Sequence, residues 1–166
     1  MITQPSAAMK VSLPSEREIV LTRDFDAPRS LVFEAFTKPE HVKCWWGHRD
    51  STLSVCEVDL RPGGAWRFVI QKANGGKEPF CGVYREITPP ERLVYTFVYD
   101  VEGYRDPGGL VTDVFQEKGK GTTLVETMLF PSVESRDTTL RSGMEAGAAE
   151  SFDRLAELLG TLKVKK

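Results

Sequence analysis

Cysteine and histidine are scarce in this sequence, which has three cysteines and two histidines among its 166 residues. Cys44, Cys56 and Cys81 are odd in number and far apart, so they exclude the paired framework of a small disulfide-rich domain. We expect them to be reduced thiols of a cytoplasmic protein. The chain needs no disulfide or metal to fold, because at this length it can bury roughly 70% of the surface that its unfolded form exposes.

An excess of one charge and a long apolar run are missing as well. Basic and acidic residues are interspersed and give a net charge of -2, so no basic stripe is available for nucleic acid phosphates or anionic lipids. No stretch approaches the roughly 18 apolar residues of a membrane span. The N-terminal residues lack the charged start and apolar core of a signal peptide. We therefore expect a cytoplasmic protein without nucleic acid or membrane partners.

The hydrophobic pattern predicts a strand, two short helices, six more strands and a long final helix in one domain, residues 16–162. The strand patterns lie at residues 16–25, 51–60, 65–71, 79–87, 91–99, 110–117 and 122–130, and the short helical patterns at 28–36 and 40–46. We expect residues 1–15 to be a loose leader and residues 163–166 a basic tail. This order predicts an α+β domain in which a curved antiparallel sheet wraps around the final helix.

The last part of the chain carries the clearest helical pattern. One apolar stripe recurs at steps of three and four: Leu140, Met144, Ala148, Phe152, Leu155, Leu159 and Leu162. The same face has almost no side chain at Gly143, Gly147 and Ser151, although a glycine inside a helix costs about 1 kcal/mol relative to alanine. The middle of the stripe either lets the sheet approach closely or leaves a cavity. We predict one continuous helix over residues 135–159, ended by Gly160 with lysines beyond it.

Four segments carry a resemblance: APRSLVFEAFTKPEHVKCWWG, DLRPGGAWRF, GVYREITPPERLVYTF and GMEAGAAESFDRLAELL. In this order they resemble homologues of the activator of heat-shock-protein-90 ATPase, and the resemblance covers nearly all of residues 16–159. That family is similar to the START-like superfamily. The resemblance implies a helix-grip fold, in which a seven-stranded sheet grips a C-terminal helix around an apolar cavity and two short helices close one end. None of the four segments is a catalytic signature.

The histidines and cysteines could form a zinc site or a nucleophilic pair, or they could be ordinary solvated and packed side chains. His41, Cys44 and His48 are spaced by three and four residues and Cys56 follows, so a zinc site is conceivable. However, the helix is expected to end before His48, and a structural zinc site needs four converging ligands. Cys44 could also reach His41 as a nucleophile, but a small packed thiol is the commoner case. We predict no metal site, no cofactor and no catalytic residue.

Three carboxylates lie in predicted strands: Glu57, Asp113 and Glu126. Alternation places Asp113 on the side of Val111 and Phe115, where a charge is costly unless it is paired. Arg49 or Arg67 could be its partner. A slip of one residue in register would turn Asp113 outward, so both orientations stay open.

Aromatic residues are more numerous than an ordinary core demands, and many fall on alternate strand positions. Together with the shallow middle of the final helix, they favour an aromatic-walled pocket in which tyrosine hydroxyl groups orient a ligand. The predicted lining residues are Trp46, Trp66, Phe68, Tyr84, Tyr95, Phe97, Asp113, Phe115, Met128, Met144, Gly147 and Phe152.

Three functions fit these features. Binding of a small hydrophobic or aromatic ligand, without transforming it, needs only the cavity and ranks first. The resemblance also implies a partner-binding module for a heat-shock ATPase, with a role in the stress response. It ranks second because the eukaryotic activators carry an additional N-terminal domain that these 166 residues lack. A cyclase-like or aromatase-like enzyme would need an acid or base that the sequence does not single out, so an enzyme ranks third.

Overall fold

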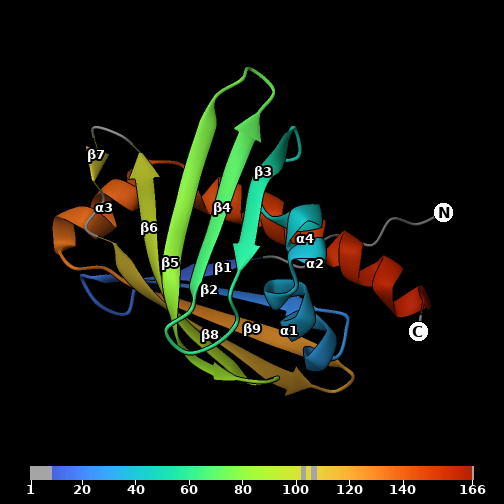
Figure 1. Ribbon diagram of the computed structural model, residues 1–166. Coiled ribbons are helices and arrows are strands. Elements are labelled where there is room, and N and C mark those ends of the chain that lie inside the picture. Colours follow the sequence, from blue (N-terminus) through green and yellow to red (C-terminus); the bar gives the residue numbers. More distant parts are fainter. Residues whose placement is uncertain (1–8, 102–103, 106–107, 166) are drawn as a thin grey trace.

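The computed structural model describes residues 9–101, 104–105 and 108–165, which form a curved antiparallel sheet around a long C-terminal helix (Figure 1). The strands are β1 (Lys10–Ser12), β2 (Glu18–Phe25), β3 (Ser51–Val58), β4 (Ala65–Lys72), β5 (Lys77–Thr88), β6 (Arg92–Val101), β7 (Tyr104–Arg105), β8 (Gly109–Lys118) and β9 (Gly121–Leu129). The helices are α1 (Arg29–Thr37), α2 (Pro39–Trp45), α3 (Val133–Arg141) and α4 (Met144–Lys165). The predicted α+β helix-grip fold is confirmed, and β1 and β7 are short additions to the seven expected strands.

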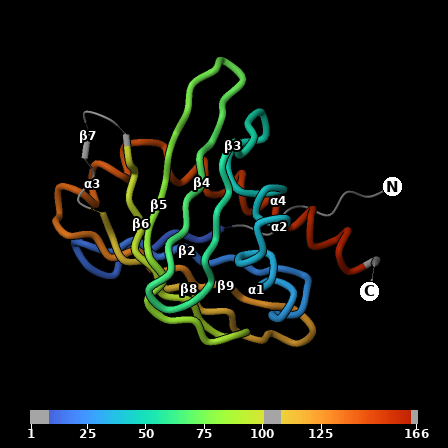
Figure 2. Tube along the Cα trace, in the orientation of Figure 1, coloured from blue at the N-terminus to red at the C-terminus, as the bar shows by residue number. Residues whose placement is uncertain are grey.

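The sheet has the strand order β1-β2-β9-β8-β6-β5-β4-β3, and β7 pairs with β6. The chain therefore crosses from β2, near one edge, through α1 and α2 to β3 at the other edge, as the trace in Figure 2 shows. The remaining long strands follow as antiparallel neighbours until β9 pairs with β2. The helices α1 and α2 lie in this connection between β2 and β3, and they cover one end of the curved sheet that holds α4 (Figure 1).

Two hydrophobic clusters hold these layers together. In the larger cluster, Leu21, Leu124 and Phe115 of the sheet pack with α1 and with Leu155 of α4. The smaller cluster joins Val42 of α2 to aromatic residues of β4 and β5. Full burial of one such side chain stabilises the fold by about 1.5–3 kcal/mol. The larger cluster therefore holds α1 and α4 against the sheet, and the smaller cluster holds α2.

The predicted single final helix is wrong, because the structure divides it into α3 and α4. Gly143 has a φ of 85°, in the left-handed region that favours glycine, and it turns the chain between the two helices. Ser132 begins α3 by accepting a hydrogen bond from the backbone N–H of Ser135 at 3.0 Å. The spacing of four from Leu140 to Met144 continues the apolar pattern across the break, which hides the break in the sequence.

Gly160 does not end the last helix, and α4 continues to Lys165. The expected basic tail is therefore helical over its described part. One glycine inside a helix costs only about 1 kcal/mol, and the apolar stripe continues beyond it at Leu162, which packs against the core. The packing of that turn outweighs the weak helix propensity of Gly160.

The N-terminal segment also differs from the expected loose leader. Lys10–Ser12 form β1, which pairs antiparallel with Val20, Leu21 and Thr22 of β2. Val11 and Met9 pack against the core. Residues 1–8 lie outside the described residues. None of the helices in the described part of the chain combines the length and the apolar character needed to cross a membrane.

Candidate functional site

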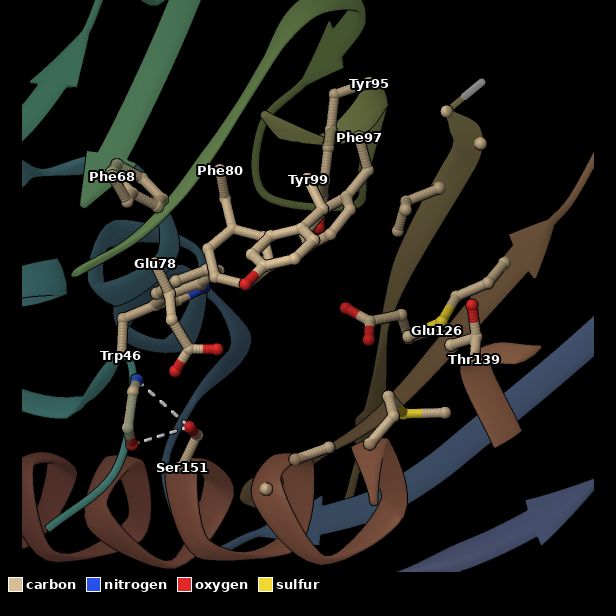
Figure 3. Close-up of a pocket in the computed structure, with 18 of the residues that line it drawn as sticks. Trp46, Phe68, Glu78, Phe80, Tyr95, Phe97, Tyr99, Glu126, Thr139 and Ser151 are labelled. Carbon is tan, nitrogen blue, oxygen red and sulfur yellow. Dashed lines mark hydrogen bonds between the residues drawn. The ribbon is translucent and has the colours of Figure 1, made fainter. Parts of the chain in front are cut away.

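A pocket of about 520 Å³ lies between the inner face of the sheet and the helices α3 and α4. Residues of β4, β5, β6, β8 and β9 form one side, and the exit of α2 closes one end (Figure 3). Ten of the twelve residues predicted from the sequence line it: Trp46, Trp66, Phe68, Tyr84, Tyr95, Phe97, Met128, Met144, Gly147 and Phe152. The structure thus brings residues from six separate segments to one space.

Asp113 and Phe115 do not line this pocket, although both face inward. Phe115 is buried beneath α1, where its ring meets Phe33 and Phe36 edge-on with centroids 5.5 and 5.2 Å away. Asp113 is fully buried behind Tyr95. Alternation along β8 predicts the correct face for both residues, but it carries no information about which other side chains cover that face.

Several lining residues are absent from the predicted lining of the pocket. They include His48, Glu78, Phe80, Tyr99 and Glu126, and α3 adds Ser135, Thr138 and Thr139. Tyr99 lies on the same face of β6 as Tyr95 and Phe97, and Glu126 lies on the same face of β9 as Leu124 and Met128, so strand alternation predicts the direction of both side chains. The lining residues of α3 could not be predicted, because the sequence pattern does not reveal the break at Gly143.

The aromatic wall is continuous from the exit of α2 to β6. The Trp46 ring lies 5.1 Å from both Phe68 and Phe80, and Phe80 lies 5.4 Å from Phe97 and 5.0 Å from Tyr99, between ring centroids. These distances are typical of tilted and edge-to-face aromatic pairs. Figure 3 shows the rings of Phe80, Phe97 and Tyr99 gathered along one side of the space. The wall offers flat apolar surface to a ligand.

Gly82 is required for this wall because β5 and β6 approach closely there. A Cβ atom at Gly82 would lie 1.8 Å from the carbonyl oxygen of Thr96 and 2.6 Å from Nε1 of Trp66. Without that atom, the Trp66 indole donates a hydrogen bond to the Thr96 carbonyl at 3.2 Å. The polar edge of the indole is thereby satisfied by the strand, and the rest of the ring belongs to the pocket wall.

Ser151 and Arg154 of α4 fix the exit of α2. The Ser151 hydroxyl donates to the Gly47 carbonyl at 2.9 Å and accepts from the Gly47 N–H at 3.1 Å, as dashed lines in Figure 3 show. The Arg154 guanidinium donates to the His48 carbonyl at 2.8 Å. We call these contacts the α2 clamp. The interpretation of Ser151 as an almost empty position is therefore wrong, because its hydroxyl holds the residue next to Trp46.

A carboxyl pair lies in the sheet beside the pocket. Asp113 of β8 and Glu126 of β9 are direct cross-strand partners, a register set by the tight turn between Lys118 and Gly121. Glu126 lines the pocket with 8% of its surface exposed, and Asp113 is fully buried. The Tyr95 hydroxyl donates to Asp113 Oδ2 at 2.7 Å.

The pair has no basic partner of the expected kind. Arg49 pairs with Glu157, and Arg67 pairs with Asp100, so the predicted pairing of either arginine with Asp113 is wrong. Arg49 is exposed and Arg67 is half-buried, and both are paired with other carboxylates rather than with Asp113. The partner of the Asp113 carboxyl group is the Tyr95 hydroxyl rather than an arginine.

Protonation of the carboxyl pair follows from burial. Burial, and then the charge of Glu126, raises the pKa of Asp113 well above its usual value, and burial also raises the pKa of Glu126. Burial and the neighbouring Asp113 raise the pKa of Tyr95, so its hydroxyl keeps its proton. Asp113 Oδ1 has no hydrogen-bond partner, and the charge of the neighbouring Glu126 disfavours a second negative charge on Asp113. The pair therefore carries at most one negative charge near neutral pH.

Residues 26–160 match the family described as Activator of Hsp90 ATPase homolog 1-like protein. The chain belongs to this family. Among solved structures, it is 29% identical to a protein from Nitrosomonas europaea, covering 92% of this chain and 99% of that one with a TM-score of 0.81. A protein from Chromobacterium violaceum is 28% identical, with coverages of 86% and 97% and a TM-score of 0.75.

A third solved structure, from Rhodobacter sphaeroides, has a TM-score of 0.85 over 93% of this chain and 99% of that one. At 23% identity it supports the fold alone. No curated protein matches the chain. Membership of the family thus establishes the START-like domain and leaves its activity to be argued from the pocket.

The metal and nucleophile candidates are not brought together in this member of the family. The thiol of Cys44 lies against the Glu40 carbonyl and that of Cys56 against the Pro39 carbonyl. Within the described residues, no three histidine, cysteine or carboxylate side chains are grouped so that they could hold a metal ion.

His48 instead lies near the solvent-exposed end of the pocket, between two acidic side chains. Its Nε2 is 4.0 Å from Glu78 of β5, and its Nδ1 is 3.7 Å from Glu150 of α4. Lys72 reaches the same Glu78 oxygen at 3.4 Å. A hydrogen bond from the backbone N–H of Arg49 lowers the pKa of Glu150, with a smaller contribution from His48. These contacts connect the sheet to α4 at the pocket rim.

Proposed function

We propose that this START-like protein binds a small hydrophobic or aromatic molecule in the pocket between the sheet and α4. The observation that carries the proposal is the continuous aromatic wall around a volume of about 520 Å³. Ligand sites typically have volumes of roughly 300–1,000 Å³ and are lined mainly by apolar and aromatic side chains with a few polar groups. The pocket has this composition, so contact area supplies affinity and the polar groups supply orientation.

The way the pocket is built supports binding rather than simple core packing. The α2 clamp holds Gly47, the residue next to Trp46, and the Trp66 indole is hydrogen-bonded to the Thr96 carbonyl. The ring faces of both tryptophans are held in place before a ligand arrives, which lowers the entropy lost on binding. Gly147 and Ala148 of α4 keep the opposite wall shallow.

A bulky substitution on that wall tests the proposal. Ala148 lines the pocket, whereas Ala146, two residues earlier on α4, is exposed. The purified protein is titrated with the neutral fluorophore N-phenyl-1-naphthylamine, monitored by energy transfer from tryptophan. Ala148→Phe is expected to weaken binding by about tenfold or more, because the ring fills space that the probe needs.

Ala146→Phe adds the same ring to the same helix outside the pocket and should leave the affinity within about twofold of the wild type. Equal loss in both variants would indicate a general effect on α4. Absence of saturable binding by the wild-type protein, or unchanged affinity in Ala148→Phe, would refute the proposal.

A second proposal, supported by the family match, is that the domain binds a heat-shock ATPase. The large hydrophobic side chains that are most exposed in the described residues, Leu13, Leu60, Val83 and Val133, come from separate segments. Such single residues do not require a partner. Capture of an Hsp90-type ATPase by immobilised protein, with stimulation of its ATP hydrolysis, would support this function; neither effect would be expected if the pocket alone is used.

A further inference from the structure

The charges that line the pocket are of one sign. Among the described lining residues, Glu78 and Glu126 are acidic, His48 at the rim is the one titratable base, and neither lysine nor arginine occurs. Figure 3 shows both carboxyl groups pointing into the space from opposite sides. Such a lining repels a ligand that carries a carboxylate or a phosphate and favours one that carries a positive charge.

The two acidic residues differ in their partners. Glu78 has Lys72 at 3.4 Å and His48 at 4.0 Å near the rim. Glu126 has no cationic partner in the described residues, and its neighbour is the second carboxyl group, Asp113. The buried guanidinium of Arg23 on β2 is directed to Asp153 of α4 at 3.3 Å and to the ring of Phe25. The described residues therefore supply no cation to balance a negative charge on the carboxyl pair.

We propose that the ligand carries a basic nitrogen on an apolar or aromatic body, and that its ammonium group binds the Glu126 carboxyl of this pair. The proposal rests on the proposed function, because it assigns a chemical class to the molecule that the pocket binds. A ligand ammonium would lie in a site with little water, where its attraction to a carboxylate is much stronger than at a surface. The apolar body would contact the aromatic wall.

Three features of the site fit an ammonium group better than a neutral hydrogen-bond donor. An ammonium compensates a negative charge on the pair, which a hydroxyl or amide group does not. The rings of Tyr95, Phe97 and Tyr99 line the pocket from β6, which only β8 separates from the strand of Glu126, and ring faces attract organic cations. The Tyr95 hydroxyl donates to Asp113 Oδ2 at 2.7 Å and so keeps the Asp113 carboxyl group in its buried position beside Glu126.

A matched set of ligands tests this assignment. The wild-type protein is titrated by calorimetry with 2-naphthylmethylamine, which is cationic at neutral pH, with neutral 2-naphthylmethanol and with anionic 2-naphthoate. We expect the amine to bind about tenfold or more tightly than the alcohol, and the naphthoate to bind weakest. Because the three compounds share one ring system, the comparison isolates the charge.

The variant Glu126→Gln keeps the size of the side chain and removes its charge. It should reduce amine affinity by about tenfold, to the level of the alcohol, and leave alcohol affinity within about twofold. Glu57→Gln makes the same change on an exposed position of β3 and should leave the preference for the amine unchanged.

Equal affinity of the wild-type protein for the amine and the alcohol would overturn the assignment while leaving the proposed function standing. A preference for the amine that survives in Glu126→Gln would also overturn it. If none of the three compounds binds, both the assignment and the proposed function fail for ligands of this size. The wild-type comparison decides the question even if Glu126→Gln does not fold.

Discussion

Ser151→Ala gives the sharpest test of how α4 supports the pocket, because the structure defines what is lost. The Ser151 hydroxyl makes both hydrogen bonds to Gly47, at 2.9 and 3.1 Å. Each such bond contributes about 0.5–1.5 kcal/mol net. Alanine regains at most about 0.7 kcal/mol through its higher helix propensity. We therefore expect the free energy of unfolding to fall by about 1–2 kcal/mol.

The Gly47 carbonyl keeps a second donor in Arg154, at 3.2 Å, but the Gly47 N–H loses its partner. The exit of α2 should loosen, and Trp46 should lose its fixed position. Urea unfolding followed by circular dichroism measures the stability, and the N-phenyl-1-naphthylamine titration should show an affinity reduced by several-fold.

Ser30→Ala is the control, since Ser30 is exposed on α1 and makes no side-chain hydrogen bond in the described part of the chain. A loss below about 0.5 kcal/mol in Ser151→Ala, with unchanged probe affinity, would show that the clamp is not needed.

Four further substitutions have defined outcomes. Phe152→Ala should cost about 3–5 kcal/mol in urea unfolding, because the ring is 4% exposed and packs on Phe25 at 6.0 Å; a loss below about 1 kcal/mol would contradict this packing. Gly147→Ala should raise the melting temperature, since the new methyl meets only His48 at 3.4 Å and helix propensity improves by about 1 kcal/mol. Gly143→Ala should lower it, because that φ of 85° strains any L side chain; the opposite order of these two melting temperatures would refute the break between α3 and α4. The effect of Asp113→Asn on the free energy of unfolding, relative to the wild type, should be more favourable at pH 8 than at pH 4 by about 1–3 kcal/mol; an effect that does not change with pH would contradict the raised pKa of the carboxyl pair.

The sign of that pH effect follows from proton linkage. The pKa of Asp113 is raised in the folded protein, so above the unfolded-state pKa of about 4 the folded state binds more protons than the unfolded state. The free energy of unfolding of the wild type therefore falls as the pH rises from about 4 toward the raised pKa values. The amide of Asp113→Asn does not ionise, can still accept from Tyr95, and can donate to Glu126. Urea unfolding of both proteins at several pH values between 4 and 8 measures the difference.

The order of the main elements could be predicted because strands and helices leave different hydrophobic periods in the sequence, two residues for a strand and about 3.6 for a helix. Alternation in β4 and β6 places Trp66, Phe68, Tyr95 and Phe97 on one face, and a sheet that covers a helix must bury that face. The family resemblance supplied the topology that connects the strands. For this reason most of the pocket wall could be predicted without knowledge of the coordinates.

The remaining features depend on contacts between distant residues. The break at Gly143 is concealed by the regular spacing from Leu140 to Met144. The pairing of Asp113 with Glu126 depends on the register across the turn at Lys118, which alternation alone does not define. The role of Ser151 depends on the exit of α2 lying beside α4. In each case the local pattern is compatible with more than one partner, and tertiary packing selects one.

Native mass spectrometry of the protein purified from its own cells tests the central claim most directly. If the pocket holds a small hydrophobic molecule with a basic nitrogen, the wild-type protein should carry a non-covalent adduct that is released on denaturation and ionises as a cation. The adduct should persist in Ala146→Phe and disappear in Ala148→Phe. Wild-type protein without any adduct, even after incubation with 2-naphthylmethylamine, or an adduct of equal abundance in all three proteins, would contradict the account.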